Sequence, residues 1–345
     1  MTRTGQGMRA VVLSEERTIE LQERPIPELR PGQVLLRSHY CGICGSDLHA
    51  PDLQLYQSPV VMGHEFSAEI VAVGTQVQHW HAGMRVVVNP NGNACGSCNE
   101  CKNAQYNLCH YATHVESTGV CRDGGMAEYV AVSGTQLHEL PDSVDSLQGA
   151  WTEPLAVALR AVKHSGIRLG DRVTVIGGGP IGLLAVQLAR RAGAAEVTLV
   201  EPSAKRREVG RAVGADYVYE PGEHSSAVAE KAIRPADRVL ECSGHQLALQ
   251  SAIDMSRPGG AIQLVAISPR PISFDPMSAI AKEVRIDAKF IYVDEFAKAI
   301  DLLARNQVET DSLTTLVVGL DEYRGAFDSL SKPDSHIKAL IRTGA

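Results

Sequence analysis

Short apolar runs separated by proline and glycine turns fill the first 141 residues of the chain. Runs rich in β-branched residues predict strands, and the turns between them predict a small antiparallel sheet or barrel. The runs are residues 10–13, 19–21, 34–36, 69–73, 85–88 and 126–132. We therefore expect a β-rich first domain.

From Trp151 the pattern changes to alanine- and leucine-rich helical spacing, and strand-like runs then alternate with helices. The runs are residues 173–176, 197–200, 217–219, 238–240, 261–265 and 284–286. Six strands that alternate with helices predict a doubly wound parallel sheet. A helical stretch at 296–303 and short runs at 315–318 and 337–341 are expected to return to the first domain. The predicted domains are 1–152 with 295–345, and 153–294.

A glycine-rich turn follows the first strand of this sheet, in the pattern Gly177-x-Gly179-x-x-Gly182. The first glycine makes the turn, the second lets backbone approach a pyrophosphate, and the third lets the helix pack closely on the strand. A phosphate then binds the free amides of the helix N-terminus, which includes Pro180 and Ile181. A turn built only for packing is the alternative, but strand, glycines and helix occur in the order that a dinucleotide site needs.

The second strand of this unit ends in Glu201, at about the ~20-residue offset of an acid that binds the ribose hydroxyls of NAD. A carboxylate there repels the 2′-phosphate of NADP, so the pattern predicts NAD. Lys205 and Arg206 could accept that phosphate if Glu201 turned away. Arg206 is otherwise a candidate to stack on the adenine.

Length and charge narrow the class of protein. At 345 residues the chain exceeds the size of a single core, and its net charge of −7 does not favour nucleic acid or an anionic membrane surface. It lacks an N-terminal apolar segment and any run of about 18 apolar residues. We expect a cytoplasmic protein with neither nucleic-acid nor membrane partners.

Four of the eight cysteines lie close together, in the spacing Cys95-x2-Cys98-x2-Cys101-x7-Cys109. Four thiolates close a tetrahedral shell around zinc and leave no position for substrate, which predicts a structural zinc site. An iron–sulfur cluster and four thiols without a metal are the alternatives.

A second set combines one thiol, one imidazole and two carboxylates: Cys44, His64, Glu65 and Glu153. Three protein ligands plus a water are typical of catalytic zinc, which acidifies a bound water or alcohol. Alternatively, His64 is a packed core histidine and Glu153 a surface acid. A nicotinamide site needs a group that ionises an alcohol, and this need favours the zinc interpretation.

Together these motifs resemble the zinc-dependent medium-chain alcohol and polyol dehydrogenases, above all the sorbitol, butanediol and threonine dehydrogenase branches. The resemblance covers essentially the whole chain and rests on Gly42–His49, Gly63–Glu65, the four cysteines, Glu153-Pro154 and Gly177–Gly182. It implies a Rossmann domain, a β-rich GroES-like catalytic domain, NAD and two zinc ions per chain.

The resemblance also implies roles at the catalytic zinc. Cys44, His64 and Glu153 would hold or flank the metal, with Glu65 beside it as a direct or alternating ligand. Asp47 would orient His64, as metal-bound histidines require.

In the same way, Ser46 would accept the alcohol proton and pass it through the nicotinamide ribose to His49. The expected reaction is hydride transfer between NAD and a secondary alcohol, polyol or amino alcohol, or its ketone, in a homodimer or homotetramer. The loop from Ala50 to Met62 is shorter than in the polyol branch. A carbonyl-reducing enzyme of this fold, the zinc-free quinone reductase branch and a non-enzymatic zinc-lobed binding protein are the alternatives.

Overall fold

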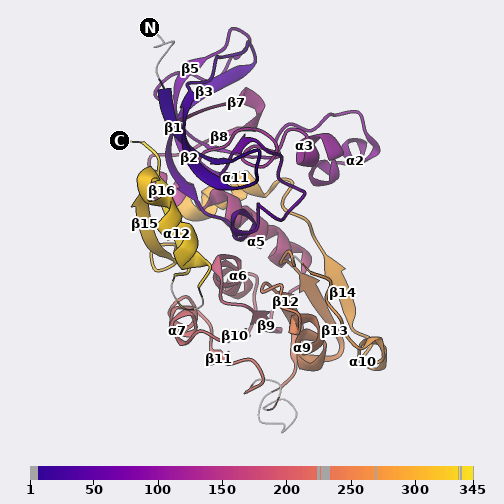
Figure 1. Ribbon diagram of the computed structural model, residues 1–345. Coiled ribbons are helices and arrows are strands. Elements are labelled where there is room, and N and C mark those ends of the chain that lie inside the picture. Colours follow the sequence, from indigo (N-terminus) through magenta and orange to yellow (C-terminus); the bar gives the residue numbers. More distant parts are fainter. Residues whose placement is uncertain are drawn as a thin grey trace. The chain divides into compact units, whose positions relative to one another are not determined.

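The computed structural model describes residues 7–223, 226, 234–268, 270–332, 334 and 336–344. It divides into two compact units (Figure 1). The first unit comprises Met1–Glu153, Phe296–Thr310 and Thr314–Ala345, and the second comprises Pro154–Glu295 and Asp311–Leu313.

The first unit is built on two sheets. A seven-stranded sheet has the order β15-β16-β3-β5-β6-β8, with β7 paired to β3, and a three-stranded sheet has the order β2-β1-β4. The strands are β1 Gly7–Leu13, β2 Ile19–Pro25, β3 Gln33–Gly42, β4 Val60–Val61, β5 Glu65–Val73, β6 Arg85–Val88, β7 Tyr129–Ser133, β8 Leu137–Glu139, β15 Thr314–Gly319 and β16 Lys338–Arg342.

Short helices connect these strands: α1 Gly45–Leu48, α2 Asn99–Lys102, α3 His110–His114, α4 Ser146–Gly149, α11 Glu295–Ala304 and α12 Tyr323–Leu330. Apolar side chains of β3, β5, β6 and α12 form one buried core, which includes Leu36, Ile70 and Phe327. The C-terminal strand β16 pairs antiparallel with β3, so Ile341 lies opposite Cys41.

The run at 126–132 is shorter as a strand than the sequence predicted, since β7 begins at Tyr129. The carbonyl of Met126 accepts a hydrogen bond from the amide of Val11, and the amide of Met126 donates a hydrogen bond to the carbonyl of Met62. Because these bonds commit Met126 to the neighbourhood of β1, pairing with β3 starts only at Tyr129.

The second unit contains a parallel sheet of six strands in the order β11-β10-β9-β12-β13-β14. This is the order of a Rossmann sheet, in which the direction of strand addition reverses between β9 and β12. The elements are β9 Arg172–Ile176, β10 Glu196–Val200, β11 Tyr217–Tyr219, β12 Ala236–Glu241, β13 Ser256–Leu264, β14 Arg285–Ala288, α5 Thr152–His164, α6 Pro180–Arg191, α7 Ala204–Ala212, α9 Ala248–Met255 and α10 Pro276–Ala281. The predicted parallel sheet is confirmed.

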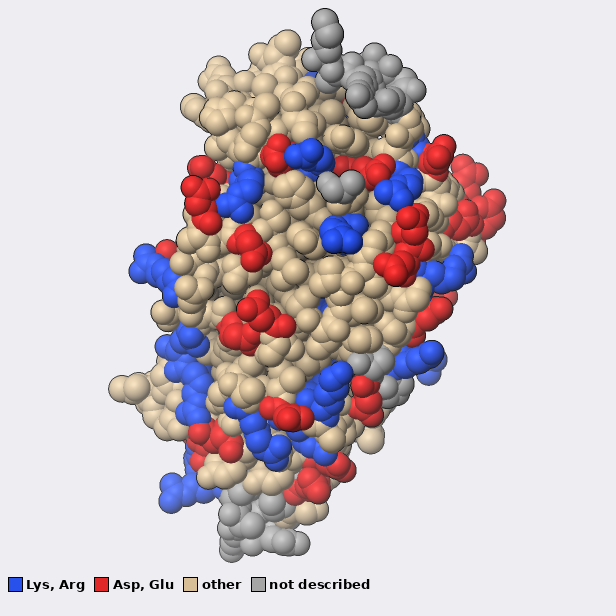
Figure 2. Space-filling model, turned by 90° about the vertical axis from the view of Figure 1, so that its left-hand side faces the viewer, with Lys and Arg blue, Asp and Glu red and all other residues tan. Residues whose placement is uncertain are grey.

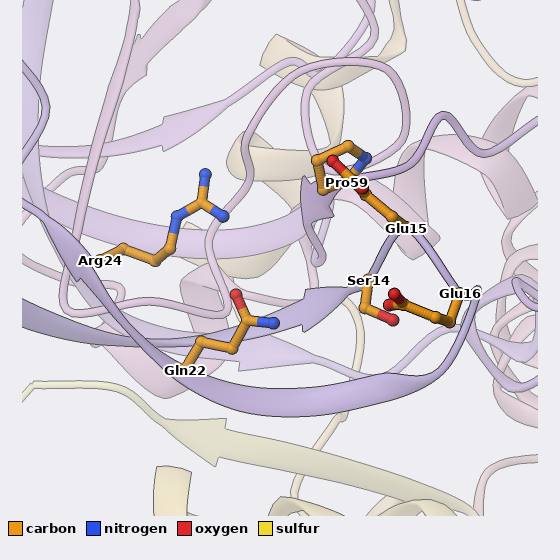
Figure 3. A pocket seen from close by; sticks show the side chains of 6 residues that line it. All are labelled: Ser14, Glu15, Glu16, Gln22, Arg24 and Pro59. Carbon is orange, nitrogen blue, oxygen red and sulfur yellow. The ribbon is translucent and has the colours of Figure 1, made fainter.

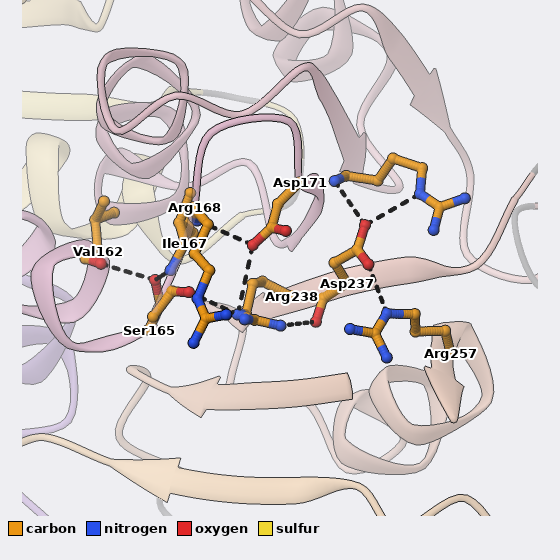
Figure 4. A network of polar contacts seen from close by, with 10 residues as sticks. Val162, Ser165, Ile167, Arg168, Asp171, Asp237, Arg238 and Arg257 are labelled. Carbon is orange, nitrogen blue, oxygen red and sulfur yellow. Dashed lines mark hydrogen bonds and ion pairs between the residues drawn. The ribbon is translucent and has the colours of Figure 1, made fainter. Parts of the chain in front are cut away.

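A polar network ties together the amino ends of three of these strands (Figure 4). The carboxylate of Asp237 accepts bonds from the backbone amide and the side chain of Arg172 at 2.9 and 3.1 Å, and from Arg257 at 2.5 Å. Burial opposes the ionisation of Asp237, but these donors hold its pKa at about 2, below the ordinary value. The network lies at the end of the sheet away from the glycine turn.

Acidic and basic side chains are interspersed on the face that Figure 2 shows. Among the described residues, no helix combines the length and the apolar character that crossing a membrane requires.

Candidate metal and dinucleotide sites

Cys44 caps the short helix α1 directly after β3 ends at Gly42. The Asp47 carboxylate in this helix accepts the backbone amide of Cys44 at 2.8 Å. A carboxylate that accepts a hydrogen bond from a backbone amide stabilises the start of a helix. This bond holds the backbone of Cys44 in place and thereby limits the direction of its side chain.

His64 directly precedes β5 and Glu65 is its first residue, and both reach the same place. Gly63 adopts a φ of 97°, and a Cβ on it would collide with Cys41 and Met126, so only glycine fits this turn. One ligand atom each of Cys44, His64 and Glu65 lies within 4.8 Å of the others. A thiol, an imidazole and a carboxylate this close together fit a zinc ion.

The surroundings of His64 suit a metal-bound imidazole. Its Nδ1 lies 3.8 Å from Asp47 Oδ1 and is buried without a hydrogen-bond partner among the described residues. Burial opposes protonation of His64, but the carboxylate of Asp47 and the thiol of Cys44 raise its pKa well above the usual value. The pocket therefore favours positive charge at this point, which a cation would supply.

Glu153 lies in the first turn of α5 and is 7% exposed. Its carboxylate contributes to the raised pKa of His64, although it does not belong to the 4.8 Å group. The structure thus places Glu65 nearer to the thiol and imidazole than Glu153.

Lys338 is a site residue that the sequence interpretation missed. Its ammonium forms an ion pair with Glu65 and donates to the carbonyl of Ile43 at 2.9 Å. The pair occupies the space beside Gly42, where a Cβ would lie 2.9 Å from Lys338 Cε. A lysine within the apolar run 337–341 was the available signal, because buried lysines need an ionic partner.

The two proposed proton-relay residues lie at opposite ends of α1. Ser46 is half-buried and its Oγ lies 2.8 Å from the hydroxyl of Tyr56, a second residue that the sequence interpretation missed. His49 is exposed at the helix C-terminus, where its ring is open to solvent.

The four cysteines of the lobe converge as their spacing predicted. Their sulfurs lie within 4.8 Å of one another, and the amides of Cys98 and Cys101 donate to the sulfurs of Cys95 and Cys98, both at 3.4 Å. Hydrogen bonds from Ser97 hold the pKa of the Cys95 thiol at about 5. Amide donors favour thiolates, the form that binds zinc, and the lowered pKa of Cys95 makes it the thiol that ionises first, whereas the pKa values of Cys98 and Cys101 are raised beside their thiol neighbours.

The glycine turn of the second unit lies where the sheet order reverses. Gly177 has a φ of 98° and packs on Ser243 beyond β12, while a Cβ on Gly182 would collide with the carbonyl of Gly177. At Gly179 a Cβ would meet nothing within 4 Å. Gly179 caps α6, so this open space lies at the helix N-terminus, next to Pro180 and Ile181.

Glu201 lies beside this turn at the end of β10 and is 4% exposed. Its carboxylate accepts hydrogen bonds from the backbone amides of Gly178 at 2.5 Å and Ser203 at 2.9 Å. Arg207, which the sequence interpretation did not single out, donates to the carbonyl of Glu201 at 2.7 Å, whereas Arg206 is half-buried on α7. The acid is therefore fixed against the glycine turn.

Comparison with known proteins agrees with this architecture. Residues 30–142 match the alcohol dehydrogenase GroES-like domain, and residues 180–305 match the zinc-binding dehydrogenase domain. Sorbitol dehydrogenase of Gallus gallus is 34% identical over 99% of this chain and 98% of the relative. The chain belongs to the zinc-binding medium-chain dehydrogenase family.

Two further members of the family cover nearly the same length. (R,R)-butanediol dehydrogenase of Bacillus subtilis is 33% identical over 97% of this chain and 99% of the relative. A zinc-binding dehydrogenase from Sinorhizobium meliloti, solved with bound NADP, superimposes with a TM-score of 0.90 at 33% identity. It covers 98% of this chain and 99% of its own. Rossmann and GroES-like domains are thus established for this chain.

Proposed function

We propose that this dehydrogenase oxidises a secondary alcohol, polyol or amino alcohol with NAD, using a zinc ion at Cys44, His64 and a carboxylate. The observation that carries the proposal is the half-buried thiol of Cys44 with the buried imidazole of His64 and carboxylate of Glu65, whose ligand atoms lie within 4.8 Å of one another, in a chain that also has a Rossmann glycine turn. A bound zinc would lower the pKa of the alcohol, and the nicotinamide would accept the hydride.

Residues around the proposed zinc site would orient its ligands and carry the alcohol proton away. Asp47 orients His64 from 3.8 Å, and Lys338 holds the Glu65 carboxylate. We propose Glu65, which belongs to the 4.8 Å group, and Glu153, which lies outside it, as alternating third ligands, with Lys338 compensating Glu65 when Glu153 holds the metal. Ser46 takes the alcohol proton while its own hydroxyl proton passes through the nicotinamide ribose towards His49, and the exposed His49 releases a proton to solvent.

We propose NAD rather than NADP because Glu201 is fixed by two backbone amides. Each amide uses one lone pair, so both carboxylate oxygens can still accept a hydrogen bond from a ribose hydroxyl. A 2′-phosphate at this position would meet the same negative charge and no donor from Glu201. The NADP bound in the Sinorhizobium meliloti relative makes this preference the first property to measure.

The test is a panel of secondary alcohols, polyols and amino alcohols with NAD⁺, followed by the absorbance of NADH. Cys44→Ser and His64→Ala should abolish turnover but keep dinucleotide binding, while Cys121→Ser, a thiol outside both clusters, should stay active. Activity that survives complete removal of zinc would favour a zinc-free reductase. Zinc and dinucleotide binding without turnover of any alcohol or ketone would favour a binding protein.

Metal analysis tests the cofactor assignment separately. Two zinc ions per chain are expected, one at the catalytic cluster and one at the cysteine lobe. Iron in the lobe, or a single zinc in active protein, would contradict the assignment. From the family resemblance we also propose a cytoplasmic homodimer or homotetramer, and light scattering would give the subunit count.

A further inference from the structure

The hydroxyl of Tyr56 joins two groups with separate roles in the proposed reaction. It lies 2.8 Å from Ser46 Oγ and 2.9 Å from Asp47 Oδ1. Tyr56 is 2% exposed, and Asp47 is fully buried. The same Asp47 carboxylate faces His64 and caps the amide of Cys44. Tyr56 therefore connects the serine to the carboxylate that orients the metal site.

The direction of these two hydrogen bonds follows from the hydrogens available. A tyrosine hydroxyl carries one hydrogen, and an ionised carboxylate can only accept. Tyr56 thus donates to Asp47, and Ser46 donates its hydrogen to Tyr56. In this resting arrangement the hydroxyl of Ser46 has a single orientation, and its lone pairs remain available to accept a hydrogen bond from the alcohol.

Arg17 holds the loop that carries Tyr56. Its guanidinium donates to the carbonyls of Pro51 at 2.7 Å, Ala50 at 2.6 Å, Leu53 at 2.8 Å and Tyr56 at 3.2 Å. One side chain thereby binds four carbonyls of the loop between α1 and β4.

The turn around Arg17 is itself shaped for this contact. Arg17 adopts a left-handed φ of 59°, which costs energy in a residue other than glycine and needs compensating bonds. An open pocket of 230 Å³ lies between this turn and the end of the same loop, lined by Ser14, Glu15 and Glu16 on one side and Pro59 on the other, together with Gln22 and Arg24 of β2 (Figure 3). The turn thus faces this loop both at residues 50–56, which Arg17 contacts, and at Pro59, which lines the pocket.

We infer that Tyr56, held in place by Arg17, is a positioning residue that orients the Ser46 hydroxyl and ties it to Asp47. This inference rests on the proposed function, in which Ser46 accepts the alcohol proton. The chain uses a short loop and one arginine to bring this tyrosine to the metal site.

A double-mutant cycle between Tyr56 and Ser46 tests the first half of the inference. Tyr56→Phe keeps the ring and should lower kcat/KM for the alcohol about tenfold, because the serine loses its fixed orientation. In a Ser46→Ala background, with zinc in excess so that the metal site stays filled, the same change should alter kcat/KM less than about twofold, since Tyr56 then acts through the serine. An equal factor in both backgrounds, or an unchanged rate in the single variant, overturns this half.

Zinc retention tests the second half without relying on turnover. Tyr56→Phe should release the catalytic zinc to a chelator several-fold faster than wild type, because Asp47 loses a donor that fixes its position. Ser46→Ala and the matched control Tyr217→Phe, an exposed tyrosine of the second unit, should release zinc at the wild-type rate. Wild-type zinc release from Tyr56→Phe overturns the link to Asp47. If the wild-type protein oxidised no alcohol, the proposed function would be wrong. The rate of zinc release would still show whether Tyr56 fixes Asp47.

Arg17→Lys tests the clamp. Lysine keeps the charge but cannot reach four carbonyls, so chymotrypsin should cut after Leu53, Leu55 or Tyr56 at least about threefold faster than in wild type. The kcat/KM should fall as in Tyr56→Phe. Unchanged proteolysis together with an unchanged kcat/KM overturns the role of Arg17.

Discussion

Replacing Lys338 with methionine should destabilise the first unit strongly. The side chains of Lys338 and Glu65 are 2% and 3% exposed, so the change leaves a carboxylate buried without its counter-ion. Breaking such a pair from one side costs about 3–5 kcal/mol, and the lost bond to the Ile43 carbonyl at 2.9 Å adds about 1 kcal/mol. A nearby zinc ion would compensate part of this charge. We therefore expect a loss of about 3 kcal/mol in the metal-loaded protein.

Urea unfolding followed by tryptophan fluorescence measures this loss, because the only two tryptophans of the chain, Trp80 and Trp151, belong to the first unit. The Trp151 ring lies 5.9 Å from the Lys338 ammonium. The exposed control Lys298→Met should stay within about 0.5 kcal/mol of wild type.

The double variant Lys338→Met with Glu65→Gln separates charge from packing. It should lose less stability than Lys338→Met alone, since no unpaired charge remains. A single variant that lost less than about 1 kcal/mol would refute the reasoning. A double variant less stable than either single one would also refute it.

Three further predictions concern other parts of the chain. Cys98→Ser should remove about one zinc per chain and lower the melting temperature, because the cysteine lobe depends on its metal; unchanged metal content would contradict this. Glu201→Ser should raise relative NADP use by about 1–3 kcal/mol in the ratio of kcat/KM values, and an unchanged ratio would argue against the role of Glu201. The pKa of Asp237 is about 2 in the folded chain and about 3.9 unfolded, so its contribution of about 2 kcal/mol is present above pH 4 and is lost as the pH falls from about 4 to 2. Asp237→Asn should therefore be less stable than wild type at pH 7 by guanidinium unfolding, and this difference should shrink towards pH 2.

Local patterns in the sequence were sufficient for the parts of the protein that are built from neighbouring residues. The four cysteines lie within fifteen residues, so their spacing alone predicts a common cluster. The glycine turn is equally local, because strand, turn and helix N-terminus follow one another directly. Alternating strands and helices also determined the Rossmann sheet, since parallel neighbours need helical crossovers.

The sequence alone could not reveal which distant residues share the catalytic cluster. Lys338 and Glu65 are 273 positions apart, and they meet because β16 and β5 both approach Gly42, where the missing Cβ leaves room for the pair. Periodicity assigns a residue to a face of a strand, but the register between strands decides what it touches.

The loop from Ala50 to Met62 also separates what the sequence determines from what the tertiary structure decides. Its sequence has no helical or strand period, and a loop takes its conformation from whatever satisfies its backbone groups. In this protein the guanidinium of Arg17, 33 to 39 positions away in the sequence, donates the hydrogen bonds that the carbonyls of this loop need. The sequence by itself determined that a short loop precedes the metal-site histidine, whereas only the tertiary structure decided that Tyr56 lies between Ser46 and Asp47, because this position depends on hydrogen bonds between two distant turns.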